Sequence, residues 1–411
     1  MNRKIFLLLL IALPFSALYA QENKIDKNKI KEDLDEIIND IAQNYVYLQE
    51  KKVDLNCIKA FYTDAIKNIK SEEETVLFFE YLLDEFYDNH LTLRTNRDAS
   101  FRLFAPVYTT IVNGQFIISN VWQSQIEGLD KNIIGAEILE FNGVDFEQAI
   151  KNFPTHCNDK DFPETKEWIA NKILAGRYNK PRILTLKLIS QEKIEIDLDK
   201  IKIKNESDLL TSQTIDGIGI IRINNSLGND DLVREFDKTL DQLSGTNGLI
   251  IDLRNTIFGG DSYEARGIMS RFISEPKPYQ MHAYIAKSKN NPDIKRSWVE
   301  YVSPRLEQYK KSVVILVGRW TGSMGEGLAI GFEGMGRAEI VGTEMRRLAG
   351  EVFDFGFKNQ WYGYKLSTRK LYHINGTIRE KYLPTHYVKQ STNTNDEILQ
   401  KGLTLIKEMI K

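Results

Sequence analysis

A single serine stands between an apolar run and a glycine-rich segment in the stretch 313–327. The run 313–317 is short and β-branched and ends at Gly318, which is typical of a parallel strand inside an α/β sheet. Residues 326–335 suit a helix that packs closely on such a sheet. Ser323 is therefore expected near a helix N-terminus, where free backbone N–H groups favour developing negative charge. Such a serine can act as a nucleophile in acyl transfer, or serve only as the helix N-cap.

A glycine pair supplies the second chemical signal. Gly259 and Gly260 follow a strand-like run that ends at Asp252-Leu253-Arg254. Glycines at a strand end let the backbone approach a ligand and direct N–H groups at an anion, although an ordinary loop explains them equally well. Together with the N–H of Met324, Gly259 or Gly260 could form an oxyanion hole.

A serine nucleophile also needs a base, and the chain has five histidines. His90 differs from the others by its setting in Asp88-Asn89-His90, at a change from helical to strand-like sequence. Nothing local proves its role. The others are His156, His282, His373 and His386.

Three regions differ in their periodicity. Residues 24–95 are charged and leucine-rich with helical spacing, and residues 103–200 shorten to strands and turns, with a hairpin signal at Asn142-Gly143. From about 214 strands and helices alternate, which predicts βαβ units and a largely parallel sheet. Chemistry in such sheets gathers beyond the carboxyl ends of the strands, where Ser323 and the glycine pair are expected.

Composition narrows the class of protein. The 411 residues are 42% hydrophobic and 27% charged with a net charge of -2, as in an ordinary globular protein without a bulk drive toward nucleic acid. No metal-ligand spacing is present, so we expect neither a metal nor a cofactor. Cys57 and Cys157 are more often buried thiols in a chain of this size, although export would permit a disulfide.

The first twenty residues resemble a secretory signal peptide. Asn2-Arg3-Lys4 is basic, 5–15 is apolar but too short to span a bilayer comfortably, and Ala20 is a suitable cleavage point. We expect an exported protein, periplasmic or extracellular, without a stable membrane anchor after cleavage.

The order of these features resembles the tail-specific (C-terminal processing) serine protease family. The resemblance covers nearly the whole chain after residue 20. It is carried by a helical segment, a D-x-H junction, a segment like that of a PDZ module at Gly135–Gly143, a D-L-R strand end with the glycine pair, and the T-G-S-x-G-E stretch around Ser323. It implies a serine peptidase that acts on a peptide or protein substrate, bound in some members by its C-terminus.

Single positions indicate the tricorn-like branch of this family. The branch with a serine–lysine dyad has a lysine in a stretch that matches 341–351, where this chain has none, and an arginine is too basic to replace it. The resemblance then implies His90 as base and Glu380 as the acid that orients it, with Asn89 and Glu326 in supporting roles. The glycine loop departs from the pattern D-L-R-x-N-x-G-G by one additional residue before the glycines.

We therefore expect an α/β multidomain protein. Its parts would be a signal peptide at 1–20, an N-terminal helical domain at 21–102, a PDZ-like β-rich module at 103–205, and a crotonase-like α/β catalytic domain (ClpP/crotonase-type) at 206–411. Two alternatives remain at this stage. One is an α/β-hydrolase-type esterase that uses Ser323, Asp354 and either His373 or His386, although Thr321 departs from its G-x-S-x-G motif. The other is an inactive PDZ-type peptide-binding protein.

Overall fold

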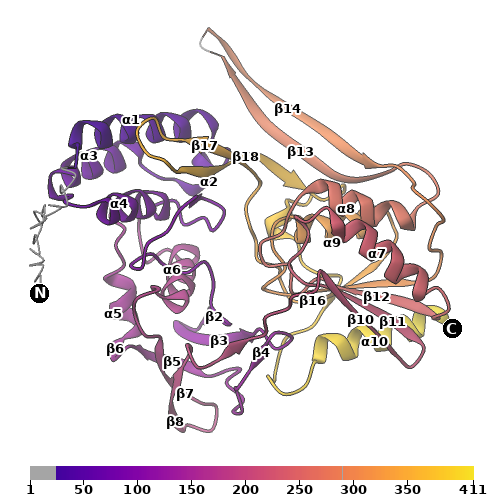
Figure 1. Ribbon diagram of the computed structural model, residues 1–411. Helices are drawn as coiled ribbons and strands as arrows, with labels where there is room; N and C mark the ends of the chain where they lie inside the picture. Colours follow the sequence, from indigo (N-terminus) through magenta and orange to yellow (C-terminus); the bar gives the residue numbers. More distant parts are fainter. Residues whose placement is uncertain (1–24, 289) are drawn as a thin grey trace, which may run out of the picture.

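The computed structural model describes residues 25–288 and 290–411 (Figure 1). The predicted signal peptide lies outside these residues. Within them, none of the helices combines the length and the apolar character that a membrane span requires.

The N-terminal region is a group of helices, as the sequence predicts. Asp26, Asp54 and Ser71 cap three of them by accepting hydrogen bonds from backbone N–H groups of the first turn. One face of the first helix, with Leu34, Ile37 and Ile41, is fully buried. The helices are α1 (Lys27–Asn44), α2 (Leu48–Lys51), α3 (Leu55–Ala65), the 3-10 turn η1 (Ile66–Asn68) and α4 (Glu72–Asp84).

The core of this helical region also contains residues from far along the chain. Phe357, Tyr364 and Leu366 pack into it from the strand pair β17 (Glu351–Gly356) and β18 (Gly363–Tyr372) and the turn between them. Strand β1 (Thr92–Leu93) pairs with β18 as well. The predicted boundary at 102 therefore does not enclose this core, because its last layer comes from the C-terminal half of the chain.

The second region is built on an antiparallel sheet with its own hydrophobic core. Asn142 and Gly143 have φ of 51° and 74°, so the predicted tight turn between β5 and β6 is confirmed. Helix α6 begins with Pro163 at its first position and packs beside β2. In the order β2-β3-β5-β7-β8, with β6 on β5, the strands are Val107–Val112, Gln115–Val121, Glu137–Phe141, Ile183–Lys187, Lys193–Asp197 and Val144–Asp145; the helices are α5 (Phe146–Lys151) and α6 (Pro163–Ala175), and β4 (Ile126–Glu127) pairs with β9 (Lys202–Ile203).

The third region confirms the predicted alternation of strands and helices. Its sheet has the order β10-β11-β12-β15-β16-β19, parallel from β11 onward, with β10 antiparallel at the edge. The strands are Leu210–Ile215, Ile218–Ile223, Gly248–Asp252, Val313–Val317, Glu339–Gly342 and His386–Tyr387. Alternate residues face opposite sides: Ile251 and Ile315 join the core under helices α7 (Asp231–Gln242), α8 (Ser262–Met269) and α9 (Met324–Gly334), whereas Ile250 and Val314 pack against α10 (Glu397–Ile410).

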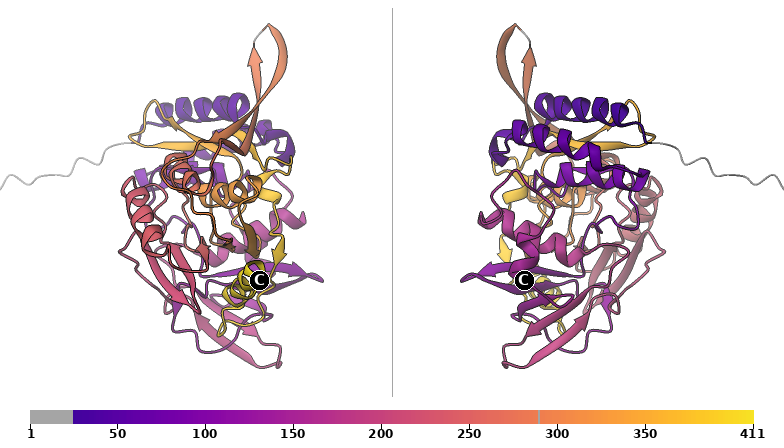
Figure 2. Two further views of the ribbon diagram at one scale, coloured as in Figure 1. Left: turned by 90° about the vertical axis from the view of Figure 1, so that its right-hand side faces the viewer. Right: turned by 90° about the vertical axis from the view of Figure 1, so that its left-hand side faces the viewer.

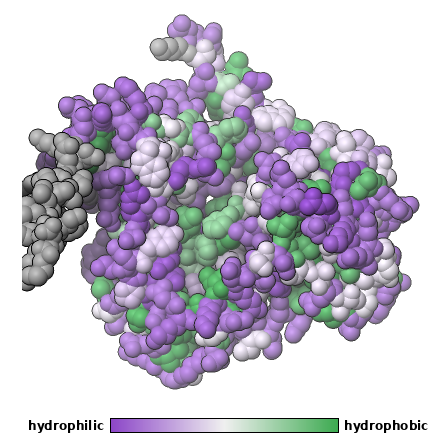
Figure 3. Space-filling model, viewed as in Figure 1, coloured by the Kyte–Doolittle hydropathy of each residue, from purple (hydrophilic) through white to green (hydrophobic). Residues whose placement is uncertain are grey.

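A long hairpin projects from this body (Figures 1 and 2). It consists of β13 (Lys277–Ser288) and β14 (Asn291–Val302), preceded by the 3-10 turn η2 (Ser270–Phe272). The middle of β13 pairs with β18, through residues 281–283. In the view of Figure 3, apolar surface lines the hollow between the helical and β-rich regions on one side and the α/β region on the other.

Candidate active site

Ser323 lies at the carboxyl edge of the parallel sheet, in the turn between β15 and α9. It is the N-cap of α9 and has a φ of 48°, and a positive φ is uncommon for a residue with a side chain. Gly322 makes this turn possible, since a Cβ there would lie 2.4 Å from the carbonyl oxygen of Ile257. The Gly322 N–H donates to Thr256 O at 3.1 Å, which joins the serine turn to the loop after β12.

His90 is the histidine that reaches this serine. Its Nε2 lies 3.3 Å from Ser323 Oγ, and its Nδ1 lies 2.9 Å from the carbonyl oxygen of Ala349. A carbonyl oxygen only accepts, so Nδ1 carries the proton and the Nε2 lone pair faces the serine hydroxyl. The His90 backbone N–H donates to Asp88 Oδ1 at 2.9 Å, and Tyr45 Oη donates to Asp88 Oδ2 at 2.8 Å.

The surroundings of His90 keep the imidazole neutral. Burial lowers its pKa to about 3, and the positive charge of Arg379 acts in the same direction. Arg346 and Lys365 also lower this pKa, whereas the hydrogen bond to Ala349 raises it. A neutral imidazole is the form that can accept a proton from a serine.

The expected contact between Glu380 and His90 is not formed. Glu380 lies in the 3-10 turn η3 (Arg379–Lys381), and the neighbouring Arg379 donates to the carbonyl oxygens of Leu348 and Gly350 at 2.9 Å each. These bonds hold the loop through Ala349 against His90, so a backbone oxygen occupies the place expected for the carboxylate. Glu380 Oε2 is buried without a hydrogen bond of standard geometry beside the Tyr47 hydroxyl; burial raises the pKa of Glu380, and Tyr47 partly opposes the rise.

The supporting role expected of Asn89 has no counterpart in the geometry either. Asn89 is exposed. The neighbouring acid, Asp88, is joined to His90 through the His90 backbone N–H instead.

Glu326 connects the two halves of the site. It is fully buried, and its carboxylate accepts hydrogen bonds from the N–H groups of Ser323 (2.8 Å), Arg347 (2.9 Å) and Leu348 (3.2 Å). One side chain therefore holds both the nucleophile turn and the loop that leads to Ala349. Burial raises the pKa of Glu326 to about 7, while Arg379 and these N–H donors limit the rise.

The candidate oxyanion donors are only partly brought together. A Cβ on Gly259 would lie 2.5 Å from Ser323 Cβ and 2.6 Å from Met324 N, so this glycine lies directly beside the nucleophile. The Met324 N–H, at the first position of α9, has no intrahelical acceptor. The Gly259 N–H itself donates to Thr256 O at 3.0 Å, and Gly260 packs against the backbone of Leu227 and Gly228. Met324 is thus the donor that the geometry offers directly.

The alternative esterase set is not assembled. Asp354 pairs with Arg94 at 2.9 Å, His373 lies 3.3 Å from Glu333, and His386 lies 3.1 Å from Glu339. Sequence reasoning missed the Ala349 carbonyl and Tyr45, because neither a backbone oxygen nor a tyrosine 43 residues from its partner Asp88 leaves a local signal.

Comparison with known proteins shows which protein families match parts of this chain. Residues 217–385 match the model of peptidase family S41, and residues 26–84 match that of the tricorn protease C1 domain. No curated protein matches the chain at a significant level. Among solved structures, mature CPAF shares the fold with a TM-score of 0.62 at 14% identity, over 94% of this chain and 97% of that chain.

Two further structures share the fold. A putative peptidase from Parabacteroides merdae ATCC 43184 has a TM-score of 0.55 at 14% identity, over 92% of this chain and 96% of that chain. The photosystem II D1 C-terminal processing protease has a TM-score of 0.53 at 12% identity, over 91% of this chain and 96% of that chain. The fold and the matched family define a serine peptidase. Residues 217–385 therefore form a domain of peptidase family S41, and together with the match to the tricorn protease C1 domain they support a tail-specific serine peptidase.

Proposed function

We propose that this protein is an exported serine endopeptidase or C-terminal processing peptidase, with Ser323 as nucleophile and His90 as general base. The observation that carries the proposal is the 3.3 Å approach of His90 Nε2 to Ser323 Oγ, with Nδ1 held by Ala349 O. The Nε2 lone pair and the serine hydroxyl then have the complementary roles that nucleophilic catalysis needs.

In this mechanism Ser323 Oγ attacks the carbonyl carbon of the peptide bond while its proton passes to His90 Nε2. The Met324 N–H, at the positive end of α9, stabilises the oxyanion. The imidazolium then gives the proton to the leaving nitrogen, the C–N bond breaks, and water hydrolyses the acyl-enzyme by the reverse transfer. Glu326 holds the serine turn and the Ala349 loop in their relative positions, and the Ala349 carbonyl oxygen, rather than Glu380, orients the base.

Export is supported by the basic and apolar pattern of residues 2–20 and by the Cys57–Cys157 disulfide, a bond that persists in oxidising compartments. The same disulfide corrects the expectation of two buried thiols. Recovery of protein beginning at Gln21 from the periplasm or medium would be the expected result of N-terminal sequencing, and an intact Met1 in a soluble fraction would contradict it.

The test of the catalytic assignment is labelling by a fluorophosphonate probe together with peptide hydrolysis. We expect Ser323→Ala to abolish both, and His90→Ala to reduce kcat by at least about a thousandfold, as removal of a general base does. The free energy of unfolding of Ser323→Ala should stay within about 1 kcal/mol of the wild type, which is what the loss of an N-cap serine costs. Probe labelling that persists in a folded Ser323→Ala variant would remove the assignment.

A further inference from the structure

We propose that Phe258, Leu103 and Phe104 form a subsite for a large apolar side chain of the substrate, next to the bond that is cleaved. This inference rests on the proposed function, because it places the subsite beside Ser323. The subsite assigns a role to the additional residue in the loop after β12. This residue is the departure from the family pattern noted in the sequence.

The position of Phe258 follows from its neighbour. Gly259 touches the nucleophile, with a Cβ position only 2.5 Å from Ser323 Cβ, and consecutive Cα atoms are about 3.8 Å apart. In a substrate residue that flanks the scissile bond, the side chain is attached to the Cα atom next to that bond. Phe258 therefore lies beside the nucleophile turn, where such a side chain would be placed.

The surface at this place is apolar and open. Phe258 is 52% exposed, although it precedes Gly259 beside a turn where most residues are buried, and Leu103, next to Phe104 in sequence, is 44% exposed. The Phe104 ring lies 5.8 Å from the Phe258 ring and 5.7 Å from that of Trp122, each in an edge-on arrangement. Exposed large apolar side chains that cluster in this way mark binding surfaces.

Arg346 holds the two sides of this surface together. Its Nη1 donates to Ile257 O at 2.7 Å and its Nη2 donates to Leu103 O at 2.8 Å, so the guanidinium bridges the residues on either side of the subsite. The Phe258 N–H donates to Asn225 Oδ1 at 2.9 Å, so the backbone of Phe258 is held in place as well. The apolar side chains therefore stand on a backbone with a defined spacing, which is what a selective subsite needs.

The same arginine indicates which side chains the subsite excludes. Burial lowers the pKa of Arg346 to about 10, so its guanidinium stays charged near neutrality, and it lies 6.0 Å from the centre of the Phe104 ring. A substrate lysine or arginine would place a second positive charge close to it in partly desolvated surroundings. Leucine, methionine and phenylalanine avoid this cost and bury apolar surface instead.

The experiment is cleavage of a peptide library by the mature enzyme, with products identified by mass spectrometry, followed by kcat/KM for matched peptides that differ at one residue beside the cleaved bond. We expect the wild type to favour large apolar residues over alanine and over lysine at that position. Phe258→Ala should lower the ratio of kcat/KM for leucine over alanine by roughly tenfold, in the range that a hydrophobic pocket supplies. Phe258→Leu should restore most of the ratio.

Phe61→Ala is the matched control, because Phe61 is a partly exposed phenylalanine, 39% accessible, on helix α3 of the helical region. It should leave the ratio unchanged. A wild type that cleaves without apolar preference, or a Phe258→Ala variant with the wild-type ratio, would overturn this inference and leave the proposed function intact. A wild type that cleaves no peptide and takes no fluorophosphonate would instead overturn the proposed function, and this inference with it.

Discussion

The partner of the His90 Nδ1–H determines how the base responds to protonation. A carbonyl oxygen orients the ring and selects its tautomer, but it compensates an imidazolium charge less than a carboxylate would. The positive charges of Arg379, Arg346 and Lys365 lower the pKa of the imidazole, and Asp88 bonds its backbone rather than its ring. The site therefore favours a neutral base in the free enzyme.

This arrangement predicts an acid limb of the kcat/KM profile well below that of an ordinary histidine. The pKa of His90 is lowered from 6.5 toward about 3, so the base stays deprotonated as the pH falls through 6.5. Lys365→Met removes a cation that lowers this pKa, so the imidazolium becomes less unfavourable and the limb should move upward. The profile would be measured from about pH 4 to 9, with Lys287→Met on the hairpin as control. A wild-type midpoint at or above 6.5 would contradict the account.

Single residues of the site differ in how far the sequence reveals them. Ser323 follows from a short motif whose chemistry is explicit, whereas the role of His90 follows only from a motif of the family it resembles, and the structure brings these two side chains together. Glu380 follows from a motif of the same kind, yet its direction depends on where Arg379 is anchored, through two carbonyls some thirty residues upstream. Such anchoring is a tertiary property and leaves no periodic pattern.

At the scale of elements, the strands and helices with one buried face are the ones that the sequence predicts. Strand β15 is an unbroken apolar run because all its residues are buried. The strands and helices from β11 to α9 carry apolar residues on the faces that join the core. The hairpin β13–β14 was not predicted, because almost every residue of β14 is exposed and no face is selected for apolar residues. Helix α6 was missed as well, since its apolar positions are interrupted and its start depends on Pro163.

In the β-rich region, one side chain occupies the edge of the sheet to which an extended peptide could add as a strand. Asn171 on α6 accepts from the Thr109 N–H at 3.0 Å and donates to Thr109 O at 2.9 Å, so it occupies the peptide groups of the edge strand β2 as a partner strand would. A peptide that added to β2 at this point would have to displace it.

We therefore predict that Asn171→Ala tightens the binding of an extended peptide to this region. Two hydrogen-bonding groups become free, and each intramolecular bond is worth about 1 kcal/mol, so Kd should fall by up to roughly thirtyfold. Anisotropy titrations would use the full chain with Ser323→Ala and peptides with free or amidated C-termini. Asn152→Ala, at the end of α5, serves as control. Unchanged or weaker binding in Asn171→Ala would show that peptides do not use the β2 edge.

At the scale of the whole molecule, the site forms where three parts of the chain meet. His90 follows the helical region, Ser323 belongs to the parallel sheet, and the Ala349 carbonyl comes from the loop that leads into β17, itself packed on the N-terminal helices. Domain boundaries drawn along the sequence cannot show this, because β17 and β18 return to a core built some 270 residues earlier. The relative placement of these parts should therefore affect activity directly.

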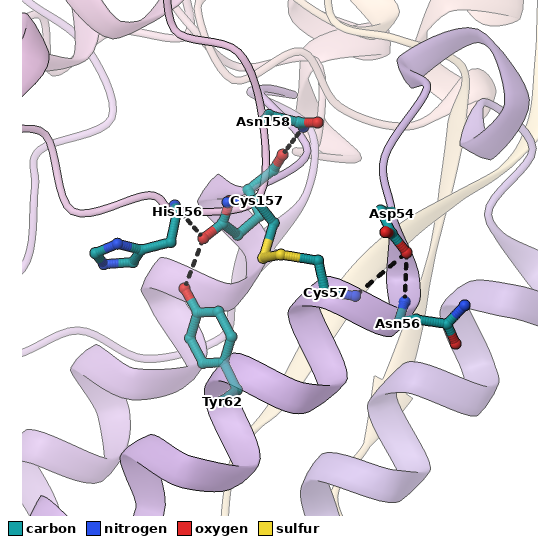
Figure 4. The surroundings of a disulfide bond; sticks show 8 residues. Asp54, Asn56, Cys57, Tyr62, His156, Cys157 and Asn158 are labelled. Atoms are coloured by element: carbon teal, nitrogen blue, oxygen red, sulfur yellow. Dashed lines mark hydrogen bonds between the residues drawn. A yellow bond between two sulfur atoms is a disulfide. The ribbon is translucent and has the colours of Figure 1, made fainter.

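The Cys57–Cys157 disulfide is a covalent link between the helical region and the β-rich region (Figure 4). It joins α3 to the segment before α6, where Glu85 accepts from the N–H groups of His156 (2.8 Å) and Cys157 (3.0 Å), five residues before His90. The cysteines are 100 residues apart, and closing a loop of that length in the unfolded chain is worth up to about 4–5 kcal/mol.

We predict that Cys57→Ala/Cys157→Ala lowers the free energy of unfolding by about 2–5 kcal/mol and reduces kcat more than it raises KM, because the segment that carries His90 loses a fixed neighbour. Calorimetry and peptide hydrolysis would be measured with and without dithiothreitol. The wild type should lose stability on reduction, whereas the double variant should be insensitive to the reductant, which separates the disulfide from other effects of the reagent. Equal unfolding temperatures for the oxidised wild type and the double variant would show that the link contributes nothing to holding these parts together.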